Sequence, residues 1–369
     1  MKTFLFKLYR AKRNKKLNRQ IDVAGLIWNH CLALHKRYYK FFGKYLEKSK
    51  LQKHLTKLKR RKKFSYLREI NSQAVQDVTD RIDRAYRLFF NNFKRGVKCS
   101  PPHFRRVKKY KSFTLKQSGW KIEAWHNTII INNQSYRYFK SREIVGKIKT
   151  ITVKRDRVGD IFIFVVTDYK KHEVFARTGK SVGFDFGFKE KILIASDGKD
   201  VLAPSFLRSN MQALKRASKS LSKKKVGSKK RKQAQLELAR IYRKADNRRK
   251  DFHWKLAQRL CSEYALICVE DLSLKGLQRR HGKKMQDYGF GMFLRILEYV
   301  ASCMGTTLIK IDRFYPSSQL CSVCGNKNPE IKDLAVREWH CTKCGAHHDR
   351  DRNAAINILN EGTKMFLSA

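Results

Sequence analysis

Apolar and polar residues follow patterns that change several times along the chain. Between residues 74 and 89 apolar positions recur every three or four residues, which predicts a helix that starts after a cap at Asn71 or Ser72. Short β-rich runs separated by turn residues come next, and they predict a small β-barrel or sandwich. These runs are residues 112–115, 128–131, 149–153 and 161–167.

From about Lys180 onward, strands alternate with long helices. Residues 182–186 and 191–196 predict a hairpin, and residues 201–203 predict a third strand. A long helical stretch follows, then a buried strand at 265–269, a helix around 293–304 and a strand at 307–311. This order predicts a mixed α/β domain with a largely buried sheet. A chain of 369 residues is expected to form roughly two to four domains.

The net charge of the chain indicates that it binds a polyanionic partner. The chain has 84 Lys and Arg against 31 Asp and Glu, a formal net charge of +53. Lys and Arg that meet phosphates release condensed counterions, so such a surface binds nucleic acid. A membrane surface also attracts basic segments, but it predicts one local cluster, whereas here positive charge runs through most of the chain. Nucleic acid is therefore the expected partner.

Two basic segments are candidate interfaces. Residues 209–263 hold 18 Lys or Arg and four acids, which predicts a helix face along a phosphate backbone, with a merely solvated basic face as the alternative. The first 63 residues hold 21 Lys or Arg and two acids, with aromatic residues between them. These aromatics can stack on bases, but an amphipathic helix that buries them is favoured for most. They are Trp28, Tyr38, Tyr39, Phe41, Phe42 and Tyr45.

Nothing in the sequence indicates export or membrane insertion. The longest apolar runs, such as residues 161–166 and 265–269, are far too short to span a bilayer. The first seven residues contain only three consecutive apolar residues, so no signal peptide is expected. The protein is therefore expected in a reducing compartment, where its nine cysteines would bind metal or remain free thiols.

Four of these cysteines form two CxxC pairs, each followed by glycine and separated by sixteen residues: Cys321 and Cys324, then Cys341 and Cys344. Two such knuckles provide the four soft ligands of a tetrahedral structural Zn²⁺ site. Nearby histidines could replace a cysteine, but four thiolates already complete the shell. These histidines are His340, His347 and His348. The other cysteines are predicted to be buried thiols, namely Cys31, Cys99, Cys261, Cys268 and Cys303.

Three separated acids are candidate catalytic residues. Asp185 lies inside an apolar strand, Glu270 ends another buried run, and Asp351 lies at the start of a short helix. Buried carboxylates are costly unless they bind something, and three that converge can hold two Mg²⁺ ions for phosphodiester hydrolysis. Asp349 competes with Asp351 as the third ligand, or caps the helix instead.

Structural roles are the alternative for the first two acids. Asp185 can pair with a basic neighbour, and Glu270 can cap the following turn together with Asp271. Gly183 and Gly187, on either side of Asp185, are predicted to let a nucleic-acid backbone approach closely.

At these residues the sequence resembles TnpB, a transposon-encoded family ancestral to type V CRISPR effectors. The motifs GFDFG, VEDL, CxxC…CxxCG and DRDxNAAxNI occur in the family's order, and the segment from Ser72 to Phe90 followed by Pro102-x-Phe104 also resembles it. The resemblance covers nearly the whole chain. It implies a RuvC-like, RNase H-type nuclease core in which Asp185, Glu270 and Asp351 are the Mg²⁺ ligands.

The resemblance also implies an organisation into four parts. These are a wedge-like β-barrel (1–15 and 105–180), an inserted helical recognition domain (16–104), the nuclease (181–315 and 346–369) and an inserted zinc ribbon (316–345). It further implies a Mg²⁺-dependent DNA endonuclease, monomeric with a guide RNA from the transposon end. Such an enzyme makes double-strand breaks in target DNA beside a short motif, in the cytoplasm of a prokaryote and associated with its nucleoid.

One pair of side chains is a candidate reader of that motif. Gln73 and Gln76 lie on one edge of the first predicted helix, and glutamine can pair bidentately with adenine in the major groove. A solvated helix face is the alternative. Two other functions remain open for the whole chain: a DNA transposase or resolvase, which would join strands, and a non-catalytic RNA-binding regulator, which would not need the buried acids.

Overall fold

The computed structural model describes residues 1–169, 179–333 and 335–368, which form two compact units. The first unit comprises residues 1–169 and the second residues 179–368. Residues 170–178, within the predicted wedge range 105–180, lie outside the described part. Among the described residues, no helix has the length and apolar character needed to cross a membrane. Each unit has its own core.

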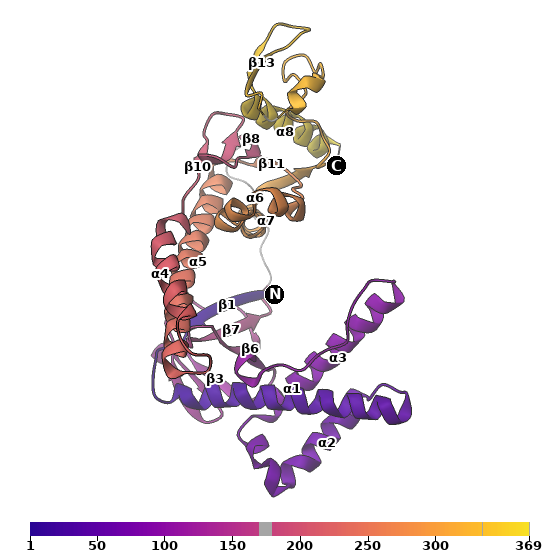
Figure 1. Cartoon of the computed structure of the whole chain (residues 1–369), viewed down its shortest axis with the longest axis vertical. Coiled ribbons are helices and arrows are strands. Elements are labelled where there is room, and N and C mark those ends of the chain that lie inside the picture. Colours follow the sequence, from indigo (N-terminus) through magenta and orange to yellow (C-terminus); the bar gives the residue numbers. More distant parts are fainter. Residues whose placement is uncertain (170–178, 334, 369) are drawn as a thin grey trace. The chain divides into compact units, whose positions relative to one another are not determined.

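The first unit contains two antiparallel sheets (Figure 1). One has the order β1-β7-β6-β2 and the other the order β3-β4-β5, and a single bridge between Leu8 and Tyr138 connects them. The strands are β1 (Lys2–Lys7), β2 (Ser112–Leu115), β3 (Trp120–Glu123), β4 (Thr128–Ile131), β5 (Gln134–Arg137), β6 (Ile148–Arg155) and β7 (Ile161–Thr167). Of the predicted β-barrel or sandwich, a closed barrel is not found in the described residues: β2 and β3 are edge strands of separate sheets, so the ladder does not close.

Three helices share one core with these sheets. They are α1 (Asn14–Phe42), α2 (Lys48–Arg60) and α3 (Ser72–Lys94), with short 3-10 turns η1 (Lys62–Arg68), η2 (Val107–Lys109) and η3 (Ala124–His126). Helices α1 and α3 pack on the four-stranded sheet, and α2 packs on α3. The predicted cap of α3 is confirmed, because the side chain of Asn71 accepts a hydrogen bond from the backbone N–H of Gln73 at 2.8 Å. The apolar positions Ala74, Val78 and Ile82 of α3 are buried in this core.

A five-stranded mixed sheet with the order β10-β9-β8-β11-β12 forms the centre of the second unit. The predicted hairpin is β8–β9, and β8, β11 and β12 run parallel. The strands are β8 (Ser181–Phe186), β9 (Lys191–Ala195), β10 (Val201–Leu202), β11 (Leu266–Glu270) and β12 (Thr307–Ile311). This arrangement confirms the mixed α/β domain that the sequence predicts.

Helices cover both faces of this sheet. One face packs against α7 (Phe290–Met304) and the C-terminal half of α5 (Lys229–Glu263). The other face packs against α8 (Arg350–Leu367). Side chains alternate along a strand. Val182, Phe184 and Phe186 therefore enter the core that the sheet forms with α5 and α7. Gly183 and Asp185 face α8.

Two glycines allow α8 to lie close to the sheet. A Cβ at Gly183 would come within 3.0 Å of the backbone of α8 at Ala355, and a Cβ at Gly362 would come equally close to Cys268. The prediction that Gly183 and Gly187 admit a nucleic-acid backbone is therefore wrong. A helix already occupies the space beside Gly183, and the carbonyl oxygen of Lys191, in the same hairpin, occupies the space beside Gly187.

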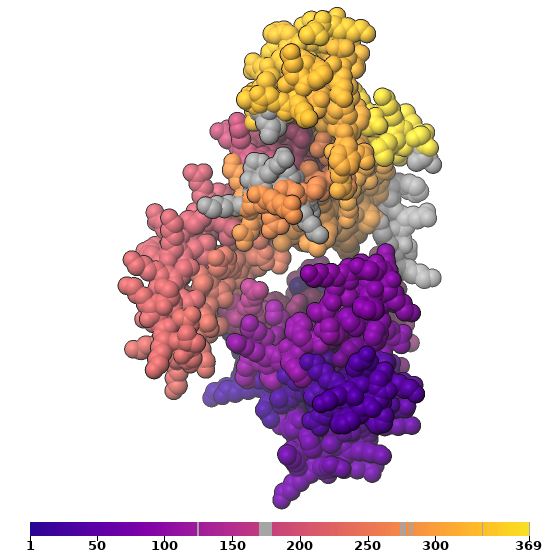
Figure 2. All heavy atoms as spheres, turned by 45° about the vertical axis from the view of Figure 1, so that its right-hand side comes forward, coloured from indigo at the N-terminus to yellow at the C-terminus, as the bar shows by residue number. Residues whose placement is uncertain are grey.

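The helices α4 (Met211–Ser222) and α5 form an antiparallel pair. Figure 2 shows this pair as an arm that extends beyond the rest of the second unit. The arm carries the basic residues that the sequence predicts along a phosphate backbone. The remaining elements are η4 (Arg208–Asn210), α6 (Leu274–Tyr288), η5 (Pro329–Lys332) and a two-stranded hairpin of β13 (Glu338–His340) and β14 (His347–Asp349).

Candidate active site

Three elements bring the predicted catalytic acids to one face of the sheet. Asp185 lies near the end of β8 and Glu270 ends β11, and these parallel strands pair so that Val269 lies opposite Phe184. Glu270 is therefore level with Asp185, and both follow the alternation of residues that face α8. Asp351 lies in the first turn of α8. The carboxyl ends of two neighbouring strands and the start of one helix thus lie on the same face of the sheet.

The electrostatics of Asp185 show that these acids interact. Burial raises the pKa of Asp185 to about 7, and the negative charges of Glu270 and Asp351 contribute further. Burial also raises the pKa of Glu270. Among the described residues neither Asp185 nor Glu270 forms an ion pair, so the alternative in which Asp185 pairs with a basic neighbour is not observed. Two buried acids without an ion pair, one of them in the field of two further carboxylates, suit a bound divalent cation.

Residues 317–322 form a hydrogen-bonded strap that holds Glu270. The hydroxyl of Ser317 donates to Oε1 of Glu270 at 2.6 Å, and the Ser317 carbonyl accepts a bond from Nδ2 of Asn357 at 2.8 Å. Asn357 and Asn353 both donate to the carbonyl of Leu320, and Asn353 accepts from the N–H of Ser322. Sequence reasoning did not assign these residues. The two asparagines of the DRDxNAAxNI motif were the available signal, since such side chains are rarely buried without polar partners.

The residues that start α8 point to different parts of the second unit. Asp349 caps the helix by accepting from the N–H of Arg352 at 2.7 Å. Arg350 is buried and donates to the carbonyl of Asp333, while Arg352 donates to Ala195 and pairs with Asp200 at 3.0 Å. Asp351 contacts Arg337 at 3.3 Å. The geometry assigns capping to Asp349 and places Asp351 where its charge reaches Asp185.

The four predicted cysteines form a cluster in which all sulfur atoms lie within 4.8 Å of one another. The two knuckles have the same backbone geometry. In each, the glycine N–H donates to the carbonyl of the first cysteine, at 2.8 Å from Gly325 to Cys321 and 2.9 Å from Gly345 to Cys341. Both glycines have a φ of 73°, which residues with a Cβ rarely adopt. Each knuckle therefore requires its glycine.

The chemistry of the cluster suits a thiolate-bound metal. Backbone N–H groups of Cys344 and Lys343 lower the pKa of the Cys341 thiol to about 6. His348 is buried, and its Nε2 lies 3.1 Å from Cys321 Sγ, so it contacts the cluster from the side. Of the other cysteines, Cys99 is exposed, which makes the prediction of a buried thiol wrong there because it lies in an open segment after α3. Cys31, Cys261 and Cys268 are buried and Cys303 is half-buried.

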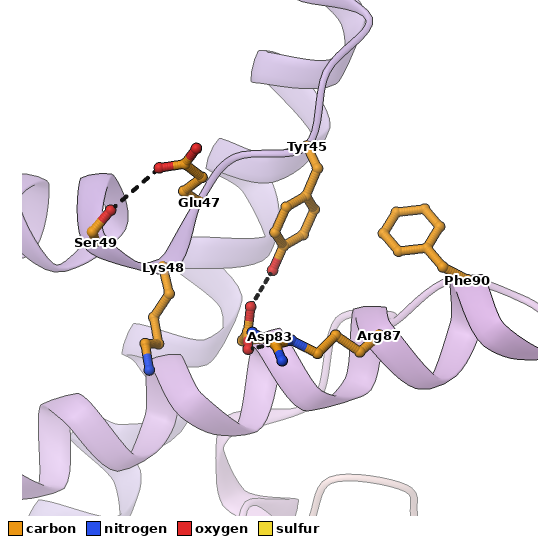
Figure 3. A pocket seen from close by; sticks show the side chains of 7 residues that line it. All are labelled: Tyr45, Glu47, Lys48, Ser49, Asp83, Arg87 and Phe90. Carbon is orange, nitrogen blue, oxygen red and sulfur yellow. Dashed lines mark hydrogen bonds and ion pairs between the residues drawn. The ribbon is translucent and has the colours of Figure 1, made fainter.

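A hollow of about 560 Å³ lies in the first unit, where the turn after α1 meets α2 and α3 (Figure 3). Its polar groups bind one another. Tyr45 donates to Asp83 at 3.0 Å and Arg87 pairs with the same carboxylate at 2.9 Å. Burial, then this hydrogen bond, raises the pKa of Tyr45 above its usual range. The network fixes the turn onto α3.

The aromatic and glutamine residues predicted to contact nucleic acid differ in how exposed they are. Trp28 is buried and Tyr38 and Tyr45 are partly buried, as the core interpretation predicts. Three others at the end of α1 are exposed instead, because α1 extends past the sheet that it packs on: Tyr39, Phe41 and Phe42. Gln76 is exposed and Gln73 is partly exposed on the first turns of α3.

Comparisons with known proteins agree with these features. Residues 164–281 match the family model described as "Probable transposase", and residues 290–358 match the one described as "Cas12f1-like, TNB domain". A Streptomyces pristinaespiralis protein named "Putative RNA-guided DNA endonuclease" is 29% identical over 369 residues, 98% of this chain and 89% of that protein. "TnpB-like protein L79" of Acanthamoeba polyphaga mimivirus is 24% identical over 324 residues, 80% of this chain and 60% of that protein.

The fold also has a solved counterpart. Cas12f1, in a cryo-electron-microscopy structure of a Cas12f1–sgRNA–target DNA complex, superposes with a TM-score of 0.57 at 14% identity. The similarity covers 95% of this chain and 83% of that one. Two family models, a relative aligned over most of both chains and a common fold thus agree, and together they support a protein of the TnpB family.

Proposed function

We propose that this chain is a transposon-associated RNA-guided DNA endonuclease that hydrolyses phosphodiesters at Asp185, Glu270 and Asp351. The observation that carries the proposal is the placement of these acids on the α8 face, where the charges of Glu270 and Asp351 act on Asp185. Among the described residues, Asp185 and Glu270 lack ion pairs. The name of the Streptomyces relative and the RNA and DNA in the Cas12f1 complex support the choice of guide and target.

The sheet supports a RuvC-like, RNase H-type core for this nuclease. Its parallel strands β8, β11 and β12 stand beside the antiparallel strands β9 and β10, with helices on both faces. In such a sheet, side chains at the carboxyl ends of neighbouring parallel strands meet at one edge, where ligands bind. The proposed acids occupy that edge.

The three carboxylates would hold Mg²⁺, a hard cation that prefers carboxylate oxygens. When bound, the metal would supply activation of a water molecule and stabilisation of the leaving oxygen. The chain's own contribution is to orient the ligands. Ser317 fixes one oxygen of Glu270, and the cap at Asp349 fixes the first turn of α8 that carries Asp351.

The cysteine cluster would hold Zn²⁺ in a structural role. Cys321, Cys324, Cys341 and Cys344 provide four thiolates, which complete a tetrahedral shell and leave no position for water. The adjacent strap, held by Asn353 and Asn357, connects this site to Glu270 through Ser317. The metal would thus stabilise the segment that orients a catalytic acid.

Gln73 and Gln76 are proposed to help read the motif beside the target. Both lie at the start of α3, one turn apart and at least partly exposed. If Gln73→Ala and Gln76→Ala leave the preference in a randomised-motif cleavage library unchanged, these residues do not read the motif.

A plasmid assay tests the proposed activity. Protein purified with its RNA is incubated with Mg²⁺ and plasmids that contain either a matched or a scrambled target. We expect linear product from the matched plasmid alone. Strand-joined products would indicate a transposase or resolvase instead, and tight RNA binding without any DNA product would indicate a non-catalytic RNA-binding regulator.

A further inference from the structure

We infer that Tyr9 and Phe139 form a stacking platform for one unpaired base of the bound RNA. The inference adds a contact to the proposed function and rests on it for the identity of the RNA. The two rings are stacked, with centroids 3.7 Å apart and planes 18° apart. Both are exposed, Tyr9 by 42% and Phe139 by 47%. Exposed parallel rings are the element on which single-stranded nucleic acids stack.

The backbone holds these rings in place. The N–H of Tyr9 donates to the carbonyl of Arg137 at 2.9 Å, and the N–H of Phe139 donates to the carbonyl of Lys7 at 2.9 Å. These bonds flank the bridge between Leu8 and Tyr138, whose side chains are both buried. The platform therefore stands on the single bridge that connects the two sheets of the first unit, and little conformational freedom would be lost on binding.

One ring face remains for a ligand. Phe139 covers one face of Tyr9, and the guanidinium of Arg137 lies over the same ring, 5.5 Å from its centroid. Because Phe139 covers one face of Tyr9, the outer face of Phe139 is the surface on which a base would stack. The resulting order is base, Phe139 and Tyr9.

The surroundings of the platform are strongly basic. Residues 7–16 contain six Lys or Arg and no acid, and residues 134–142 contain three and no acid. Three of these cations are paired with acids. Asp160 contacts Lys7 at 2.9 Å and Arg10 at 2.7 Å, and Glu143 contacts Lys140 at 2.5 Å. Arg13 and Lys16 instead bind the carbonyl of Ser135 and the amide oxygen of Gln134. Cations anchored around an exposed ring suit the phosphates on either side of a stacked base.

RNA is the occupant that this geometry favours. A base can stack on Phe139 only when it is unpaired, and the loops and ends of a folded RNA present such bases permanently. A DNA duplex presents one only after it has been opened. The platform should therefore be occupied in the complex of protein and RNA before any target DNA is added.

Ultraviolet crosslinking followed by mass spectrometry tests this occupancy. In the complex of full-length protein with its co-purified RNA, we expect a ribonucleotide adduct on the peptide that contains Phe139. Detection of an adduct only after target DNA is supplied, or of none in either state, would overturn the inference. The readout requires no cleavage, so it holds even if the chain cuts no DNA.

Binding of defined probes tests the energetics. With RNA-free protein, Phe139→Leu should weaken binding of a fluorescein-labelled 12-nucleotide oligouridine roughly 5- to 150-fold, the range for loss of one base–aromatic stack. Binding of a 12-base-pair RNA duplex should not change. The slope of log affinity for oligouridine against log salt concentration should not change, because no ionic contact is removed.

Matched variants complete the test. Phe139→Trp keeps a ring and should retain wild-type affinity. Leu5→Ala removes a similarly exposed side chain, 44% accessible, from β1, the strand that precedes Tyr9, and should change the binding of neither probe. Thermal unfolding checks that every variant is folded. Equal weakening by Phe139→Leu and Leu5→Ala, or an unchanged oligouridine affinity in folded Phe139→Leu, would contradict a stacking platform.

Discussion

The hydroxyl of Ser317 lies 2.6 Å from Oε1 of Glu270 and donates a hydrogen bond to it. This contact joins the end of a buried strand to a residue four positions before the first cysteine knuckle. Asn357 holds the carbonyl of the same serine from the middle of α8. Glu270 is therefore oriented by a partner that is itself fixed, and its second oxygen remains for a cation. Partners of metal-ligating carboxylates determine ligand geometry in this way.

Replacement of Ser317 by alanine should weaken catalysis without changing RNA binding. Loss of such a partner typically lowers metal affinity or activity by roughly 10- to 100-fold. Single-turnover cleavage at increasing Mg²⁺ concentration measures both effects, and we expect a higher metal requirement. Ser317→Thr keeps the hydroxyl and should recover most of the rate. If the alanine and threonine variants lose activity equally, the hydroxyl does not orient Glu270.

Replacement of Gly183 by alanine should destabilise the second unit. The added Cβ would press on the backbone of α8 at Ala355, which cannot move away as a flexible side chain would. Overpacking of this kind costs about 1–3 kcal/mol, and it should also displace Asp351. Thermal unfolding measures the loss. As a control, Gly282→Ala on α6 meets no neighbouring atom within 4 Å and should leave the melting temperature unchanged or raise it slightly.

The roles of Gly183 and Ser317 show where sequence reasoning reached its limit. Local periodicity predicted the strands because alternation is set by adjacent residues, and the acids became candidates because a carboxylate within an apolar run is unusual. The close approach at Gly183 depends on a helix more than 160 residues later in the chain, so its partner was misassigned. The bond from Ser317 to Glu270 spans 47 residues and has no local pattern.

The same limit applies to Asp349 and Asp351. Their order of importance depends on the residue at which the helix begins, and periodicity does not fix helix ends to one residue. In the fold, α8 begins at Arg350, so Asp349 is the cap and Asp351 lies inside the first turn. Sheet closure was overestimated for a similar reason, since strand runs such as 112–115 do not reveal which edges pair.

His35 should make the stability of the protein depend on pH. Burial lowers the pKa of this histidine from 6.5 to about 4 in the folded protein, and the charge of Asp83 only partly opposes the shift. The unfolded chain therefore binds more protons between these values, and stability is complete above pH 6.5 and falls as the pH approaches 4. At pH 5 the expected loss relative to pH 8 is about 2 kcal/mol.

His35→Phe provides the comparison, because the ring stacks between Tyr45 and Tyr86 at 5.1 and 4.8 Å. Phenylalanine keeps these contacts and cannot be protonated. Chemical unfolding at pH 8 and pH 5 should show a smaller loss for this variant than for the wild type. His126→Phe, at an exposed position, should behave as the wild type. Identical pH dependence of all three proteins would show that His35 is not the titrating group.

Purified protein should contain one zinc ion per chain, and Cys341→Ser should lose it. Structural zinc contributes folding free energy directly, so the hairpin of β13 and β14 should become sensitive to protease. Elemental analysis and limited proteolysis measure the two effects. Cys99→Ser changes an exposed thiol outside the cluster and should retain zinc. Wild-type protein without zinc, or a Cys341→Ser protein that keeps a full equivalent of zinc, would contradict a structural zinc site in the cysteine cluster.

The roles of Asp349 and Asp351 can be separated by isosteric variants. Asp351→Asn removes a charge from the proposed metal site and should abolish cleavage while RNA affinity remains, since loss of one ligand cripples a site that acts as a unit. Asp349→Asn retains a side-chain oxygen that can accept from the N–H of Arg352, so it should keep most activity. Asp349→Ala loses the cap, about 1 kcal/mol of helix stability, and should cut more slowly because the turn that carries Asp351 is less ordered. Single-turnover cleavage of matched plasmid and RNA binding are measured on all three. Robust cutting by Asp351→Asn would overturn its assignment, and complete inactivity of Asp349→Asn would make Asp349 a metal ligand rather than a cap.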